Sequence, residues 1–175
     1  MSPAVEVHRR LLERWRTAMD LVGPGPVDSH FDDAMAVAGL LSPRGRWLDL
    51  GAGAGFPGVA LAASHPAAEF TLVERRQKRA AFLREVIHAA GLANARVFEG
   101  DAATLPAAEW DGVTSRAYKP PEAYLADARR LLRPGGIAAL LTTGELPEVD
   151  EMMVVSRHEY IVDGRARLLA IYRRD

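Results

Sequence analysis

The chain has 175 residues, 49% of them hydrophobic and 26% charged, so it can bury one sizeable core but is too short for two ordinary domains. It contains no cysteine, which excludes disulfides, thiolate nucleophiles and cysteine-ligated metal centres. Its formal net charge of -1 excludes a basic field over the whole surface, so a nucleic-acid partner would need a local basic patch.

Neither a metal site nor a membrane segment is expected. The five histidines are scattered along the sequence without the paired spacing typical of zinc sites. No apolar run approaches the roughly 20 residues that cross a bilayer, and the N-terminal stretch carries charges where a signal peptide would be apolar. We therefore expect a cytoplasmic protein without a metal and without a membrane partner.

Two helices are predicted ahead of the core. Apolar residues in "VEVHRRLLERWRTAMDLV" recur at steps of three and four, which predicts an amphipathic helix over 5–22. The "GPGP" at 23–26 must end that helix. Asp28 or Ser29 can cap a second helix, which closes at "SPRG". We interpret 1–175 as a single domain, with 1–44 as a helical extension on the substrate side and 45–175 as the core.

In the core, predicted strands alternate with predicted helices. Short apolar runs indicate strands over 46–50, 69–74, 95–101, 110–117 and 137–144, with helices over 58–65, 76–92 and 121–136. This alternation is typical of crossover connections, so the fold class is α/β, with a mostly parallel open sheet and helices on both faces. The segment 153–175 alternates in two runs around Asp163-Gly164, which predicts an antiparallel C-terminal hairpin.

A glycine-rich loop, "GAGAGFPG", follows the first core strand. Gly51, Gly53 and Gly55 allow a tight turn and a close approach of a ligand to the backbone. Their spacing is not G-x-G-x-x-G, and no Lys followed by Ser or Thr occurs, so a phosphate cradle is disfavoured. Asp49, just before the loop, suits a ligand with a cationic head, such as the amino group and sulfonium of S-adenosylmethionine. The alternative is a purely structural strand-to-helix turn.

Acidic residues also end the next two strands. Glu74 can accept hydrogen bonds from both ribose hydroxyls of an adenosine, although it can instead stabilise the N-terminus of the following helix by its charge. Asp101 is suited to hold the adenine amino group, and Ala102 can offer its backbone N–H to a ring nitrogen. The series 49, 74 and 101 therefore predicts an adenosine-bearing ligand without phosphates.

Over about residues 8–141 the chain resembles the RsmG (GidB) methyltransferases. The resemblance is carried by "DLGAGAGFPGVALA", "TLVERRQKRAAFLREV" and "WDGVTSRAY". It implies a Rossmann-like class I methyltransferase that transfers a methyl group from S-adenosylmethionine to N7 of a guanine in 16S ribosomal RNA. The substrate would be 16S rRNA or a small-subunit precursor particle, and we expect a monomer.

The resemblance and the strand-end pattern together give a set of expected site residues. Arg116 would face the cofactor and the incoming base, and Tyr118 could stack on that base. The alternative for Arg116 is an ion pair with Asp101 or Glu74, and "YKPPE" at 118–122 can simply begin a helix. The expected cofactor-binding residues are Asp49, Gly51, Ala52, Gly53, Gly55, Phe56, Glu74, Asp101, Ala102, Ala103 and Arg116.

Contacts with RNA are expected from Arg10 and Arg14 of the first helix, which project away from its apolar stripe, and from Lys119. Each arginine-rich run can also be an ordinary solvated helix face. The Lys-Gly that members of the family usually carry after the strand ending near Leu141 is absent. Two other functions therefore stay open: a small-molecule or peptide methyltransferase on the same core, and a non-catalytic cofactor-binding domain.

Overall fold

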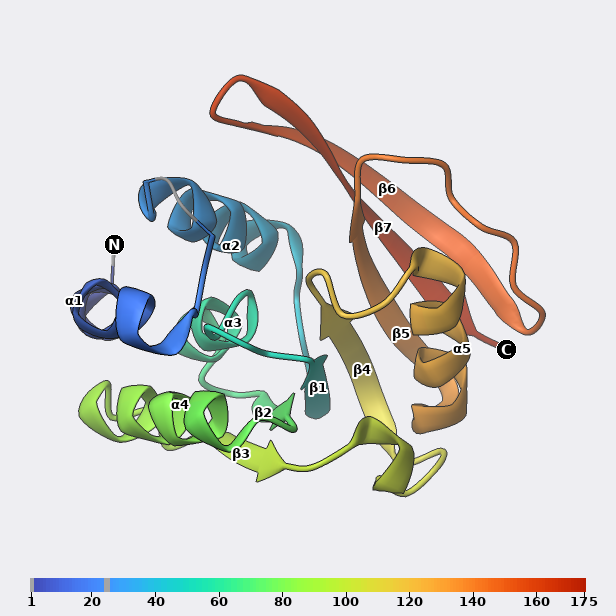
Figure 1. The fold of residues 1–175 in the computed structure, drawn as a ribbon. Helices are drawn as coiled ribbons and strands as arrows, with labels where there is room; N and C mark the ends of the chain where they lie inside the picture. The colour runs from blue at the N-terminus through green and yellow to red at the C-terminus, as the bar shows by residue number, and fades with distance from the viewer. Residues whose placement is uncertain (1, 24–25) are drawn as a thin grey trace.

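The computed structural model describes residues 2–23 and 26–175, and its seven strands form one sheet in the order β3-β2-β1-β4-β5-β7-β6 (Figure 1). The first five strands of this order pair in parallel. Strand β7 pairs antiparallel with β5, and β6 pairs antiparallel with β7. This confirms the predicted α/β class. The strands are β1 (Arg46–Leu50), β2 (Glu69–Glu74), β3 (Ala95–Glu99), β4 (Trp110–Ser115), β5 (Leu132–Thr142), β6 (Met152–Val162) and β7 (Arg165–Arg174).

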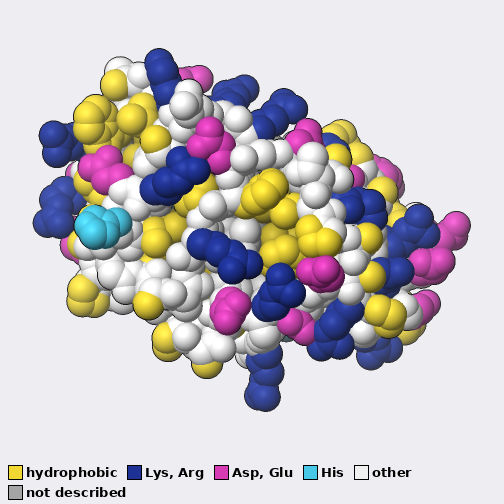
Figure 2. All heavy atoms as spheres, turned by 90° about the horizontal axis from the view of Figure 1, so that it is seen from below, with side chains coloured by type: hydrophobic (Ala, Val, Ile, Leu, Met, Phe, Trp, Pro, Cys, Tyr) yellow, Lys and Arg dark blue, Asp and Glu magenta, His cyan; other side chains and the backbone are white. Residues whose placement is uncertain are grey.

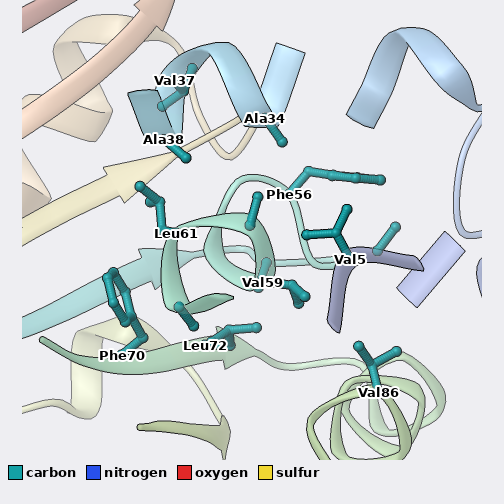
Figure 3. Close-up of a cluster of buried hydrophobic side chains, with 14 of the residues drawn as sticks. Val5, Ala34, Val37, Ala38, Phe56, Val59, Leu61, Phe70, Leu72 and Val86 are labelled. Carbon is teal, nitrogen blue, oxygen red and sulfur yellow. The ribbon is translucent and has the colours of Figure 1, made fainter. Parts of the chain in front are cut away.

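Helices cover both faces of the sheet because alternate strand residues are apolar on both sides. Trp47 and Phe70 face a core shared with α1 (Pro3–Met19), α2 (Asp28–Leu40), α3 (Gly58–Ser64) and α4 (Gln77–Ala89), part of which Figure 3 shows. Leu48 and Leu50 face the opposite core, which α5 (Pro121–Leu131) and the short 3-10 helix η1 (Ala102–Thr104) complete.

The two N-terminal helices form as predicted, but their ends differ in detail. Helix α1 ends at Met19 because Asp20 adopts the left-handed conformation and its N–H bonds to the Arg16 carbonyl. The helix therefore stops before "GPGP", of which Pro24 and Gly25 lie outside the described residues. The predicted cap of α2 is wrong: Val27 occupies the cap position and makes no side-chain cap bond, while the Asp28 carboxylate pairs with Arg9 of α1.

The boundary between α5 and β5 also differs from the prediction. The sequence predicts a helix that runs to 136, but α5 ends at Leu131 and β5 begins at Leu132. Leu132 pairs with Trp110 of β4, and Gly135 has a φ of 78°, which a helix cannot accommodate. The register of β4 against β5 shifts just past Trp110. The "RPGG" segment therefore belongs to β5 as an irregular part of the strand.

The C-terminal hairpin is confirmed. Asp163 and Gly164 have φ values of 49° and 69° and join β6 to β7 in the two-residue turn that their sequence predicts. Residues 143–151 connect β5 to β6 without a helix. In the described parts of the chain, no helix is long and apolar enough to cross a bilayer.

Candidate functional site

Two cavities lie beside the glycine loop, at the carboxyl ends of the parallel strands. The larger is about 770 Å³ and the smaller about 380 Å³, and Gly51, Arg79, Ala117 and Lys119 line both. The strand order reverses between β1 and β4, so this edge is where open α/β sheets bind ligands. The predicted location of the site therefore lies beside these two cavities.

The glycine loop needs glycine for both conformation and space. Gly51 and Gly55 have φ values of 65° and 94°, which disfavour any residue with a side chain. A Cβ on Gly51 would lie 2.8 Å from a ring carbon of Tyr118, and one on Gly55 would lie 2.7 Å from Val59. Gly51, Ala52, Gly53 and Phe56 all line the larger cavity, whereas Gly55 is not among the residues lining either cavity.

Glu74 lines the smaller cavity and fastens the glycine loop to the start of α4. Its Oε2 accepts a hydrogen bond from the Gly53 N–H at 3.0 Å, and its Oε1 accepts one from the Arg76 N–H at 2.8 Å. Each carboxylate oxygen has a second lone pair, so these bonds are compatible with the predicted ribose contact. The ribose role itself stays a prediction.

Asp49 lies beneath the glycine loop and is not among the residues lining either cavity. Its Oδ2 accepts a hydrogen bond from the Gly58 N–H at 2.9 Å, which holds the first turn of α3. Its Oδ1 is buried and has no hydrogen-bond partner among the described residues. Complete burial raises the pKa of Asp49 to about 8, although the Gly58 bond acts in the opposite direction. The buried position of Asp49 therefore disfavours its ionised form.

The segment after β3 forms one wall of the smaller cavity. Asp101 and Ala102 line it, while Ala103 does not. The Asp101 Oδ1 accepts a hydrogen bond from the Ala103 N–H at 2.9 Å. Arg130 of α5 supports this segment from behind by donating to the Ala102 carbonyl at 2.6 Å and to the Leu105 carbonyl at 2.9 Å. Arg130 had no sequence signal.

Arg116 lies between the loop and α2. Its guanidinium stacks over the Phe56 ring at 4.6 Å, and its Nη1 lies 3.6 Å from Asp33 Oδ2 and donates to His30 Nδ1 at 3.2 Å. The ion pair considered for Arg116 therefore exists, but its partner is Asp33 rather than Asp101 or Glu74. Burial lowers the pKa of Arg116, and the carboxylates of Asp33 and Asp49 raise it.

Three residues that sequence reasoning did not assign to the site complete this cluster. His30 and Asp33 line the larger cavity from α2, and Tyr160 lines it from β6. The Tyr160 hydroxyl donates to Asp33 Oδ1 at 2.8 Å, and burial together with Asp33 raises the pKa of this phenol above its usual range. For His30 and Asp33 the one available signal was the "DSHFDDA" segment, which loosely resembles a His-x-x-Asp-Ser-Leu segment of the RsmG methyltransferases; Tyr160 had no such signal.

His8 of α1 is a further residue that sequence reasoning missed. Its buried ring lies 4.9 Å from the Phe56 ring, and its Nε2 lies 2.7 Å from the Ala54 carbonyl oxygen. Burial lowers the pKa of His8 to about 4, so the neutral ring donates this hydrogen bond from Nε2. The N-terminal helix thus supports the glycine loop directly.

Tyr118 and Lys119 lie at the start of α5. The Tyr118 hydroxyl donates to Asp127 at 3.1 Å, and the Lys119 ammonium pairs with the same carboxylate at 2.6 Å. Tyr118 lines the smaller cavity and Lys119 lines both. Helix α5 begins at Pro121, which confirms that "YKPPE" begins a helix; the stacking and RNA roles stay predictions.

The two arginines predicted to contact RNA lie away from both cavities. Arg10 and Arg14 are exposed on α1, and the Arg14 guanidinium lies 5.0 Å from the Trp15 ring. Neither is among the residues that line a cavity. No group of three or more potential metal ligands occurs within the residues that the structure describes.

Comparisons with known proteins agree with this geometry. Residues 3–164 match the family described as GidB, rRNA small subunit methyltransferase G. A ribosomal RNA small subunit methyltransferase G of Rhodopseudomonas palustris is 34% identical over 153 residues, which are 83% of this chain and 69% of that protein.

Solved structures share the fold. A predicted O-methyltransferase from Agrobacterium tumefaciens matches with a TM-score of 0.65 and 27% identity, over 81% of this chain and 80% of its own. The TYW2 protein of M. jannaschii, solved in complex with AdoMet, matches with a TM-score of 0.66 and 13% identity, over 84% of this chain and 77% of its own.

Proposed function

Because this chain belongs to the GidB family of rRNA small subunit methyltransferases G, we propose that it uses S-adenosylmethionine to methylate N7 of a guanine in 16S ribosomal RNA. The observation that carries this proposal is the pair of cavities that meet at Gly51, one beside Glu74 and Asp101 and the other beside Arg116. The chain is accordingly a methyltransferase.

The residues of the smaller cavity fit the adenosine part of the cofactor. Glu74 and Asp101 supply carboxylate acceptors for the ribose hydroxyls and the adenine amino group. Gly51 has a left-handed conformation and no side chain, so a ligand can approach the backbone where the two cavities join. When bound, S-adenosylmethionine supplies an electrophilic methyl group on a sulfonium.

The larger cavity fits the incoming base. N7 of guanine already carries a lone pair and no proton, so the reaction needs positioning and desolvation rather than a general base. Arg116 uses its Nη1 for both Asp33 and His30, so its Nη2 can donate to the O6 oxygen that neighbours N7. The Asp33 carboxylate can balance the positive charge that the methylated base acquires.

The N-terminal segment is part of this proposed substrate side. Leu21, Val22, His30 and Asp33 line the larger cavity together with core residues. We therefore keep 1–44 as a substrate-side extension of a single domain.

The test is incubation with isotopically labelled S-adenosylmethionine and either transcribed 16S rRNA or small ribosomal subunits lacking the modification. Nucleoside analysis by mass spectrometry should find 7-methylguanosine with at least one of these substrates. Arg116→Ala should give no product, while Arg84→Ala, an exposed arginine paired with Glu99, should be active. Cofactor binding without methylation of either substrate would favour a small-molecule or peptide methyltransferase, or a non-catalytic domain.

A further inference from the structure

The larger cavity is strongly basic although the chain as a whole is not. The described residues that line it include five cations, Arg79, Arg116, Lys119, Arg165 and Arg167, and one carboxylate, Asp33. The formal net charge of the whole chain is -1. Figure 2 shows the face of the molecule seen from below, on which basic side chains are interspersed with acidic and apolar ones. The excess of positive charge at the cavity is therefore local.

Three of the five cations are engaged within the protein. Arg116 pairs with Asp33, Lys119 pairs with Asp127, and Arg79 donates to the Asp20 carbonyl at 2.5 Å. Within the described residues, no ion pair joins Arg165 or Arg167 to a carboxylate. Arg79 also has no carboxylate partner among these ion pairs, so Arg79, Arg165 and Arg167 are the cavity cations whose charge is left for an external anion, and the last two lie together on the hairpin.

The register of the hairpin explains why both arginines face the cavity. Arg167 lies opposite Tyr160, and Arg165 lies opposite Val162. Alternate residues of paired strands share one face of the sheet, so both arginines lie on the face where Tyr160 bonds to Asp33 of α2. In Figure 1 the hairpin extends beyond the ends of β4 and β5, on the side of α2.

We propose that Arg165 and Arg167 of the β6–β7 hairpin hold the phosphates of the RNA whose guanine enters the larger cavity. The inference rests on the proposed function. Two residues apart in a strand, the arginines are spaced by about 7 Å, similar to successive phosphates along a nucleic-acid strand. Arginine also binds phosphate in a bidentate manner. The hairpin, rather than Arg10 and Arg14 of α1, is then the main electrostatic contact.

The experiment measures binding of radiolabelled, transcribed 16S rRNA to the full chain on filters as a function of salt concentration. Three double variants are compared with the wild type: Arg165→Gln with Arg167→Gln, Arg10→Gln with Arg14→Gln, and Arg157→Gln with Arg173→Gln. The last pair is the matched control, because both arginines lie in the same hairpin but do not line the cavity. Calorimetry with S-adenosylhomocysteine and thermal melting verify that each variant is folded.

The hairpin variant should lower the slope of log affinity against log salt by roughly 1.4 to 1.8 units, since each lost phosphate contact removes about 0.7 to 0.9. The control pair and the α1 pair should each change it by less than about half a unit. A slope that stays unchanged in the hairpin variant but falls in the α1 variant would overturn the inference alone. Wild-type protein that binds neither 16S rRNA nor small ribosomal subunits at low salt would overturn the proposed function and the inference together.

Discussion

Replacing Asp49 by asparagine should make the stability of the protein less dependent on pH. The carboxyl group is completely buried, with Oδ1 lacking a partner among the described residues, and burial raises its pKa from 3.8 to about 8. Below pH 3.8 the group is protonated in both the folded and the unfolded chain. As pH rises toward 8, the unfolded chain loses the proton while the folded chain keeps it, so the free energy of unfolding falls.

The size of the change in stability follows from the interval between the pKa of Asp49 in the unfolded chain and its pKa in the folded chain. Each pH unit between the two pKa values lowers the free energy of unfolding by about 1.4 kcal/mol, so the loss between about pH 5 and pH 7 is roughly 3 kcal/mol. Asparagine keeps an oxygen that can accept the Gly58 N–H but cannot ionise. The stability advantage of Asp49→Asn over the wild type should therefore widen by roughly 3 kcal/mol across this range.

Urea unfolding at several pH values, followed by circular dichroism without cofactor, measures this difference. Comparing the two proteins at each pH cancels any constant cost of the amide. Asp32→Asn, which removes an exposed carboxylate of α2, is the matched control and should produce no widening. A constant difference between Asp49→Asn and the wild type would refute the reasoning, because it would mean that Asp49 is ionised in the folded protein.

Three further predictions concern the cofactor and the reaction. The affinity for S-adenosylmethionine relative to S-adenosylhomocysteine should rise between about pH 6 and pH 8, because the sulfonium favours the ionised form of Asp49. In Asp49→Asn, calorimetry should find the same pH dependence for the affinities of both ligands. A ratio of the two affinities that does not change with pH in the wild type would contradict this coupling. Glu74→Gln should weaken S-adenosylhomocysteine binding by about 1 to 3 kcal/mol through lost ribose contacts, and a loss under about threefold would leave Glu74 only its bonds to the loop and α4. Arg116→Ala should abolish methyl transfer in the labelled assay while the cofactor affinity stays within roughly tenfold, and normal product formation would exclude the proposed positioning role.

The glycine loop and the strand ends could be predicted because their chemistry is local. "RWLDL" and "EFTLVE" are apolar runs with clear limits, and the structure has strands over the same residues. Gly51 and Glu74 follow from the turn and from the strand end, and both lie at a cavity. The end of α5 was harder to predict, because "ARRLL" has high helix propensity and only its pairing with β4 makes Leu132 a strand residue.

The contacts around Arg116 could not be predicted because they join distant parts of the chain. Asp33 and Tyr160 are separated by 127 positions, and neither has a local pattern that points to the other. The same holds for His8, whose apolar neighbours in the helix gave only a buried stripe. Long-range polar contacts of this kind depend on the folded topology rather than on periodicity.

The position of β7 between β5 and β6 has a consequence for the order in which the protein is completed during synthesis. Strand β6 leaves the ribosome before β7 but has no place in the sheet until β7 arrives to pair with β5. A chain interrupted before Arg165 would therefore lose two strands from the sheet, and the Tyr160 hydroxyl would not be held against Asp33. The wall that the hairpin gives to the larger cavity is thus completed last, after the N-terminal helices and the strand ends beside Gly51 are in place.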